Sequence, residues 1–155
     1  MKKIFKVNWL FISILFFLLF LNVKGYSQLL NDQVSIVQKC VDLPNINQYL
    51  IKNADGSYKE LHIMNFPFPF EDGIGAMKFS IPIVFNSRSE IQNVNPDMFW
   101  SFKKFLITST GASVIFEINY NRLSSTPKFL FVSVDLNKTK GNWNILNSTI
   151  NNKPL

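Results

Sequence analysis

The last third of the chain carries the pattern that most restricts the fold. Apolar and polar side chains alternate through residues 113–121 and again through residues 129–137. A period of two is the period of a β-strand that buries one face and exposes the other. A third segment, residues 142–150, follows the turn sequence NKTKGN, in which Gly141 is free to adopt a positive φ. The sequence therefore predicts three antiparallel strands joined in chain order.

Two helical segments are predicted before these strands. Asp32 can cap a helix that Pro44 ends, and its apolar residues recur at helical spacing: Val34, Val37, Cys40 and Val41. The sequence SRSE, residues 87–90, matches a capping box, in which a serine and a glutamate side chain each accept a hydrogen bond from the other's backbone N–H. It predicts a short helical turn.

A clearer helix is predicted to begin at Asn95, with Pro96 at its first position and MFWSFKKFL following. At about 100° per residue, one stripe collects most of its apolar side chains. They are Met98, Phe99, Phe102, Phe105 and Leu106. Trp100 falls almost opposite this stripe, beside two lysines. We therefore expect an exposed tryptophan, which suits contact with a partner because its ring is large and amphipathic.

Two more strands are expected in the middle of the chain. The turn sequence ADGSY leads into residues 58–65, where Leu61 and Ile63 point to one side and their neighbours to the other. Residues 78–85 form the second strand, with four apolar side chains on one face: Phe79, Ile81, Ile83 and Phe85. Pro82 makes this strand peripheral, because proline has no N–H to donate to a neighbour.

Between these strands lies the sequence FPFPF, residues 66–70. In an extended chain Pro67 and Pro69 would lose their donors on one edge, while Phe66, Phe68 and Phe70 would project to one face. Such a segment can pair on one side only, so it is expected to be an edge strand or a strap. We interpret it as a lid on the protein's own core. The alternative is the mouth of a ligand site.

The amino terminus reads MKKIFKVNWLFISILFFLLFLNVKGYSQ. Lysines, then an apolar run, then a polar exit are typical of a secretory signal peptide. Cleavage is expected after Ser27, with Gly25 as the alternative point, which makes residues 28–155 one exported domain in the periplasm or the medium of a bacterial cell. An uncleaved anchor is less favoured, because the run of about 13 to 15 apolar residues is shorter than the roughly 20 needed to cross a bilayer.

Charge and cysteine content narrow the classes of partner. Of the 16 basic residues four precede the cleavage point, together with none of the 10 acidic ones, so the formal charge falls from +6 to +2. A nucleic-acid partner is therefore not expected. Cys40 is the only cysteine, which excludes an internal disulfide. We expect no metal, no cofactor and no membrane span after removal of the signal.

Helices followed by a run of strands predict an α+β domain, with one or two helices packed on a mostly antiparallel, twisted sheet. The closing hairpin reads VSVDLNKTKGNWNILNSTI, with a tryptophan just past the turn. This pattern resembles the end of domains in the nuclear transport factor-like, or cystatin-like, superfamily. The resemblance implies a cone-shaped sheet. It implies no single activity, because members include dehydratases, isomerases, ligand binders and structural modules.

Three polar residues are candidates for chemistry: Glu117, Asp135 and His62. Each lies in the middle of a predicted strand, opposite the more continuous apolar row, so they are expected to share one face of the sheet. If the predicted helix closed that face into a pocket, the carboxylates would be placed for acid and base work. Otherwise the face is an ordinary solvated one. Cys40 and His62, the only thiol and imidazole, lie on different elements.

These features favour a non-catalytic binding or interaction module, with an unknown protein or a small hydrophobic ligand as partner. The expected contact residues are Trp100 and the three phenylalanines of FPFPF. One alternative is a ligand carrier, or an isomerase or dehydratase, that uses Glu117, Asp135 and His62. Another is an antagonist of a second exported protein, with Trp100 in the contact.

Overall fold

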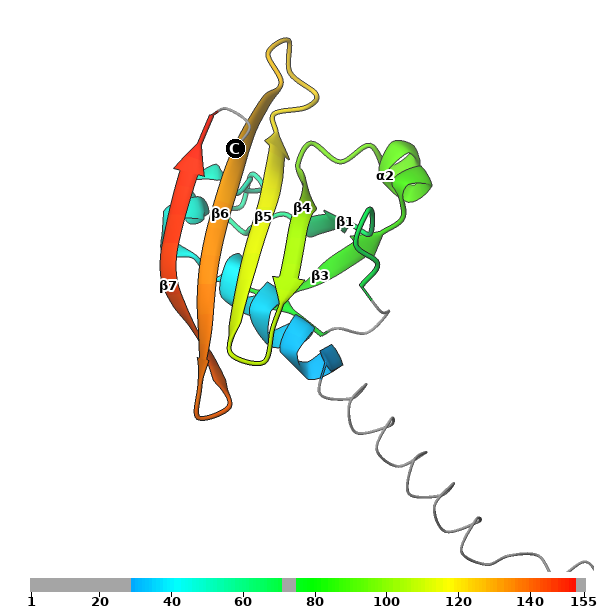
Figure 1. The fold of residues 1–155 in the computed structure, drawn as a ribbon. Helices are drawn as coiled ribbons and strands as arrows, with labels where there is room; N and C mark the ends of the chain where they lie inside the picture. The colour runs from blue at the N-terminus through cyan, green and yellow to red at the C-terminus, as the bar shows by residue number, and fades with distance from the viewer. Residues whose placement is uncertain (1–28, 71–74, 153–155) are drawn as a thin grey trace, which may run out of the picture. The chain divides into compact units, whose positions relative to one another are not determined.

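The computed structural model describes residues 29–70 and 75–152 (Figure 1). The predicted signal peptide and its cleavage points lie outside these residues. The chain divides into two compact units, Met1–Gln33 and Val34–Leu155. Residues 29–33, the described end of the first unit, are helical. The second unit holds all the strands.

A strongly curled sheet of seven strands forms most of the second unit, in the order β2-β3-β1-β4-β5-β6-β7 (Figure 1). The strands are β1 Leu61–Met64, β2 Met77–Lys78, β3 Ile81–Asn86, β4 Phe99–Ile107, β5 Gly111–Tyr120, β6 Lys128–Thr139 and β7 Asn142–Asn151. β1 runs parallel to both neighbours, β3 and β4, and the other pairs are antiparallel. Few helices pack on this sheet, which confirms the α+β class.

The predicted meander of the last third is confirmed as β5, β6 and β7. Val114, Phe116 and Ile118 of β5 are fully buried, and they alternate with partly exposed residues as the pattern predicts. The turn between β6 and β7 places Lys140 and Gly141 at φ values of 50° and 82°. Two successive positive φ angles match the right-handed twist of a hairpin, which explains the glycine at this position.

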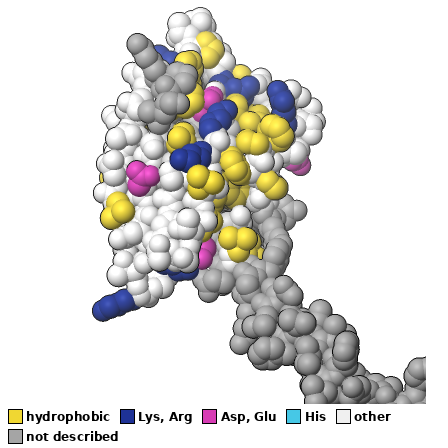
Figure 2. Space-filling model, viewed as in Figure 1, with side chains coloured by type: hydrophobic (Ala, Val, Ile, Leu, Met, Phe, Trp, Pro, Cys, Tyr) yellow, Lys and Arg dark blue, Asp and Glu magenta, His cyan; other side chains and the backbone are white. Residues whose placement is uncertain are grey.

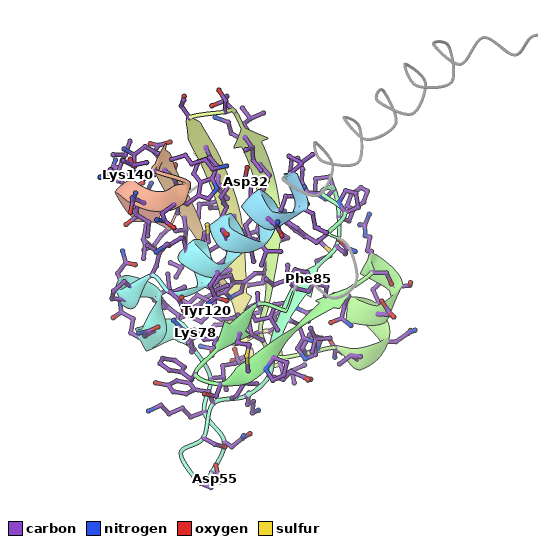
Figure 3. The ribbon with its side chains drawn as sticks, turned by 90° about the horizontal axis from the view of Figure 1, so that it is seen from below. Asp32, Asp55, Lys78, Phe85, Tyr120 and Lys140 are labelled. Carbon is purple, nitrogen blue, oxygen red and sulfur yellow. The ribbon has the colours of Figure 1, made fainter. Side chains whose placement is uncertain are left out.

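The amino-terminal helix covers residues 29–41 of the described chain, and the core lies between the inner face of the sheet and residues 34–41, the part of this helix in the second unit. Figure 3 shows residues 34–41 of this helix along the hollow side of the sheet. Its fully buried side chains include the predicted apolar residues Val37, Cys40 and Val41. Asp32 does not cap the helix, because residues 29–31 are already helical. After Leu43 the chain continues as a 3-10 helix, η1 (Pro44–Tyr49).

The helix predicted from Asn95 is wrong, because residues 99–107 form β4. The register between β4 and β5 shifts between Phe102 and Lys104, so β4 has one extra residue there. Such a β-bulge reverses which positions face inward. Phe102 and Phe105 consequently both contact the core, three residues apart. The bulge therefore gives a strand the apolar spacing of a helix.

The single strand predicted over residues 78–85 is also wrong, because it is a hairpin. Phe79 and Ser80 adopt φ values of 50° and 65° and join β2 to β3. Phe79 is 47% exposed and stacks on Tyr58 at 4.3 Å between ring centroids. Lys78 turns inward instead, and its Nζ donates to the carbonyl oxygen of Val41 at 2.6 Å. Burial lowers the pKa of Lys78, and the nearby Asp42 opposes this shift.

The FPFPF segment is a strap that covers the core only in part. Phe70 is 3% exposed, with edge-on contacts to Phe102 and Phe105. The Asn65 side chain holds it in place by accepting from its N–H and donating to its carbonyl oxygen. Phe68 is partly buried, but Phe66 is 54% exposed. The phenylalanines do not share one face, because the chain bends at residues 67–68.

Candidate functional site

Glu117 and Asp135 share the outer face of the sheet, as predicted, but they do not form a pocket. Glu117 lies opposite Phe131, four residues before Asp135 on β6, which separates the two carboxylates by about 13 Å along the strand. Glu117 pairs instead with Lys103, with 3.1 Å between Nζ and Oε2. The helix that was predicted to close this face does not form, because residues 99–107 are a strand. Of the two alternatives for these carboxylates, the pocket therefore lacks its cover, and the structure agrees with the solvated face.

Trp100 is fully buried, so the prediction of an exposed tryptophan is wrong. Its ring stacks on Phe116 in the core at 5.0 Å between centroids, and its indole N–H has no hydrogen-bond partner among the described residues. Burial comes from its position in β4, where it points to the same side as Phe102. Trp100 is therefore not available as a surface contact.

Cys40 is equally inaccessible. It lies on the inner side of the amino-terminal helix and is fully buried. Burial raises the pKa of its thiol, because the interior disfavours the thiolate. A protonated, enclosed thiol is a core residue and a poor nucleophile. It therefore does not form a catalytic pair with His62.

His62, the third predicted candidate, lines an open cleft of about 290 Å³. The cleft lies between the segment that leads into β1, the segment that follows α2 (Arg88–Val94), and the loop between β5 and β6. Its polar lining includes Lys59, Glu60, His62 and Asp97, and its apolar lining includes Val94, Met98 and Leu123. Three segments distant in sequence thus meet at one imidazole.

The His62 ring has a fixed orientation. The residue is 9% exposed, and its Nδ1 lies 2.8 Å from Oδ1 of Asn86 on the neighbouring strand β3. An amide oxygen can only accept, so Nδ1 carries a proton, and in the neutral form of the ring Nε2 is an acceptor. Nε2 lies 3.6 Å from Oε2 of Glu60. In that form of the ring, two acceptors lie side by side at the cleft.

The far wall of the cleft is held by Asp97. Its carboxylate accepts from the N–H of Leu123 at 2.9 Å, and its backbone carbonyl accepts from the N–H of Arg122 at 3.1 Å. The Arg122 side chain donates to the carbonyl oxygen of Pro96 at 2.6 Å and lies over the Phe99 ring. These bonds fix the β5–β6 loop against the start of β4. The cleft is therefore formed before any ligand arrives.

The near wall depends on α2. The predicted capping box is present: the Ser87 N–H donates to the Glu90 carboxylate at 2.6 Å, and Ser87 Oγ accepts from the Glu90 N–H at 3.2 Å. These hydrogen bonds with Ser87 lower the pKa of Glu90. The helix ends at Asn95 in the left-handed conformation, which turns the chain toward β4. Val94, its last residue, lines the cleft.

A second exposed feature is the outer face of β4, β5 and β6. In Figure 2, viewed as in Figure 1, hydrophobic side chains gather with basic ones between them. The exposed apolar residues of these strands include Leu106 at 57% and Phe129 at 48%, and Phe129 contacts Phe131 edge-on. Single exposed apolar residues are ordinary, but a group of them marks a surface suited to contacts.

Sequence reasoning found His62 but missed its neighbours in the cleft. Glu60 stands two positions before His62, and this same-face spacing could have identified it. Asp97 falls within the helix predicted from Asn95, where the structure has a bend that leads into β4. Its place in the cleft depends on the contact with Leu123, which is 26 residues away in sequence. Nothing local indicates such a contact.

The described part of the chain has neither a group of metal ligands nor a membrane-spanning helix. Within 29–70 and 75–152, no three His, Cys, Asp or Glu residues are placed to hold a metal ion. No helix in these ranges is long and apolar enough to cross a membrane.

Comparison with known proteins adds no family. No family model, no curated protein and no solved structure matches the chain.

Proposed function

We propose that this chain is a small exported binding protein that does no chemistry of its own and holds an apolar amine in the cleft beside His62. The observation that carries the proposal is the pair of acceptors at the cleft, Nε2 of His62 and the carboxylate of Glu60, 3.6 Å apart. An ammonium group has three donors and no acceptor, so it complements both atoms at once.

The charge of the cleft supports a cationic ligand. Glu60 and Asp97 contribute two negative charges, and Lys59 contributes one positive charge. Lys59 is exposed, so its ammonium group is free to stay in solvent. The side chain of Glu60 is 57% exposed, so a ligand can reach it without displacing the fold. A hydrogen bond between charged partners is stronger than a neutral one.

The walls of the cleft support an apolar body of modest size. Val94, Met98 and Leu123 line it, and its volume is about 290 Å³. Ligand pockets usually range from about 300 to 1,000 Å³. The cleft therefore suits one ring or a short chain attached to the amine.

An acid–base enzyme is the second candidate, and the same imidazole favours it. Asn86 holds the ring so that Nε2 can take a proton from a substrate, and a fixed orientation is what a general base needs. Glu117 and Asp135 do not line this cleft, so they are not part of this candidate. Turnover of a bound compound, rather than simple binding, would favour the enzyme.

We also propose a cellular location and a superfamily for this domain. Export to the periplasm or the medium is supported by the lysines and the apolar run of the amino terminus. Membership of the nuclear transport factor-like, or cystatin-like, superfamily is supported by one long helix packed against an antiparallel meander of β4 to β7.

The proposal is tested by titrating the purified protein with 2-phenylethylamine, and with phenylacetate as the matched anion. His62 is the only histidine, so its ring resonances report directly on the cleft. We expect saturable shifts with the amine and none with the anion. Removing the charged acceptor with Glu60→Gln should cost roughly 1.5 to 3 kcal/mol, which weakens binding by a factor of about 10 to 100.

Asp135→Asn is the matched control, because it removes an exposed carboxylate from the outer face of the sheet, away from the cleft. It should leave binding of the amine unchanged. The proposal fails if neither probe binds, or if Glu60→Gln binds the amine as tightly as the unchanged protein.

A further inference from the structure

The sheet has one long free edge. β7, Asn142–Asn151, stands at one end of the strand order and, among the described strands, pairs only with β6. The opposite end is β2, which has two residues. An edge strand directs the N–H and C=O groups of alternate residues away from its neighbour, and these form a template for another strand. β7 is ten residues long, so it is the longer of the two edges.

This edge lacks two of the usual protections. Its sequence, NWNILNSTIN, contains no charged residue and no proline. Proteins normally place lysine or proline on such strands to prevent pairing with another chain. Instead, Leu146 is 66% exposed and Ile145 is 38% exposed. The short β2 at the other edge carries a lysine, Lys78, so one edge strand contains a charged residue and the other does not.

A β-bulge lies at the centre of β7. Asn147 pairs with Asp135, and Ile145 pairs with Leu136, so Leu146 is the extra residue. Before the bulge, Ile145 points inward, because its partner Leu136 is in the core. After it, Ser148 points inward with its partner Val134. The bulge thus changes the inward positions of β7 from odd to even numbers.

This change makes β7 complementary to itself. Consider two β7 strands from two subunits that lie side by side, antiparallel, and are related by a two-fold axis between Leu146 and Asn147. Asn144 then lies opposite Thr149 of the partner subunit, and Ile145 lies opposite Ser148 of the partner subunit. Without the bulge such a register would oppose residues of different faces. With it, each opposed pair outside the bulge shares a face, as a continuous sheet requires.

We propose that two copies of this chain join through their β7 edges into one continuous antiparallel sheet. The contact is isologous, since each subunit uses the same strand in the same way. No like charges meet across it, because β7 is uncharged. It lies on the opposite edge of the meander from β4 and is independent of the His62 cleft.

The first test measures mass in solution by light scattering over a range of concentrations, using protein purified from cells that produce the full chain. We expect a dimer that Leu146→Lys weakens at least tenfold, because it places two like charges beside the axis. Leu106→Lys is the matched control: Leu106 is 57% exposed, on β4. It should leave the dimer intact.

The second test reads the register. Asn144 and Thr149 are both exposed, and within one chain they are about 17 Å apart. The double variant Asn144→Cys with Thr149→Cys should form covalent dimers under mild oxidation by copper phenanthroline. Neither single variant should form covalent dimers, because no second introduced cysteine then lies opposite the first across the contact. Cys40 does not interfere, since it is fully buried.

Three results would overturn the proposal. One is a monomer at every concentration with no cross-link in the double variant. Another is a dimer that survives Leu146→Lys but is lost in Leu106→Lys, which would place the contact on the outer face of the sheet. The third is equal cross-linking of the single and double variants.

Discussion

At the scale of single residues, three phenylalanines in one short segment have three different environments. Phe70 is enclosed by aromatic rings, Phe68 is partly covered, and Phe66 is mostly in solvent. In the sequence, the regular spacing of the three phenylalanines predicted the same environment for each of them. The difference comes from the bend at residues 67–68 and from the two hydrogen bonds that Asn65 makes to Phe70.

The first stability prediction follows from this difference. Phe70→Ala should lower the free energy of unfolding by about 3 to 5 kcal/mol, because it removes a buried ring and leaves a cavity. Phe66→Ala is the matched control within the same segment and should change it by no more than about 0.5 kcal/mol. Urea unfolding of both variants measures the difference. Equal effects would show that the segment does not cover the core as described.

At the scale of elements, the sequence predicted correctly those strands and helices whose residues follow a single local pattern. The meander was predictable because β5 and β6 alternate and a hairpin turn leads into β7, and α2 was predictable because its capping box is local. β4 was not, because one extra residue near Lys103 gave it the spacing of a helix. The hairpin at Phe79 and Ser80 was missed because neither residue commonly adopts a positive φ.

The capping box of α2 gives the second stability prediction. Ser87→Ala should lower the free energy of unfolding at pH 7 by about 1 kcal/mol, the usual effect of losing an N-cap. The pKa of Glu90 is lower in the folded protein than its ordinary value of 4.5, so its contribution is present above that pH and is lost as the pH falls through the folded pKa.

The cost of Ser87→Ala should therefore shrink as the pH falls through the folded pKa of Glu90, because protonation of that carboxyl weakens the box. Urea unfolding in a series of buffers from pH 7 downward measures this. A cost that is the same at every pH would mean that Glu90 does not take part. Gln92→Ala is the control, since Gln92 is exposed in α2 and lies outside the capping box.

At the scale of the whole molecule, the site was the least predictable part. His62 could be singled out as the only imidazole, but the cleft around it depends on the parallel pairing of β1 with β3 and β4 and on the tie from Asp97 to Leu123. Both are long-range contacts. A periodicity analysis reports which face a residue occupies and contains no information about which distant segment covers it.

Cys40 gives a prediction for the second unit as a whole. Its thiol is fully buried between helix and sheet, and burial raises its pKa. A thiol reagent such as Ellman's should therefore label the folded protein at no more than the rate of unfolding, and the denatured protein at once. Rapid labelling without denaturant would show that the helix separates from the sheet while the strands remain paired.

The parallel pairing of β1 has a consequence for the order of assembly. β1 is made before both of its partners, β3 and β4, and it cannot join β4 until residues 99–101 have been synthesised. The strands of the meander, by contrast, each pair with the next one along the chain. Near-neighbour contacts form faster than distant ones, because they close shorter loops. We therefore expect the meander to form first and the histidine cleft to be completed on it afterwards.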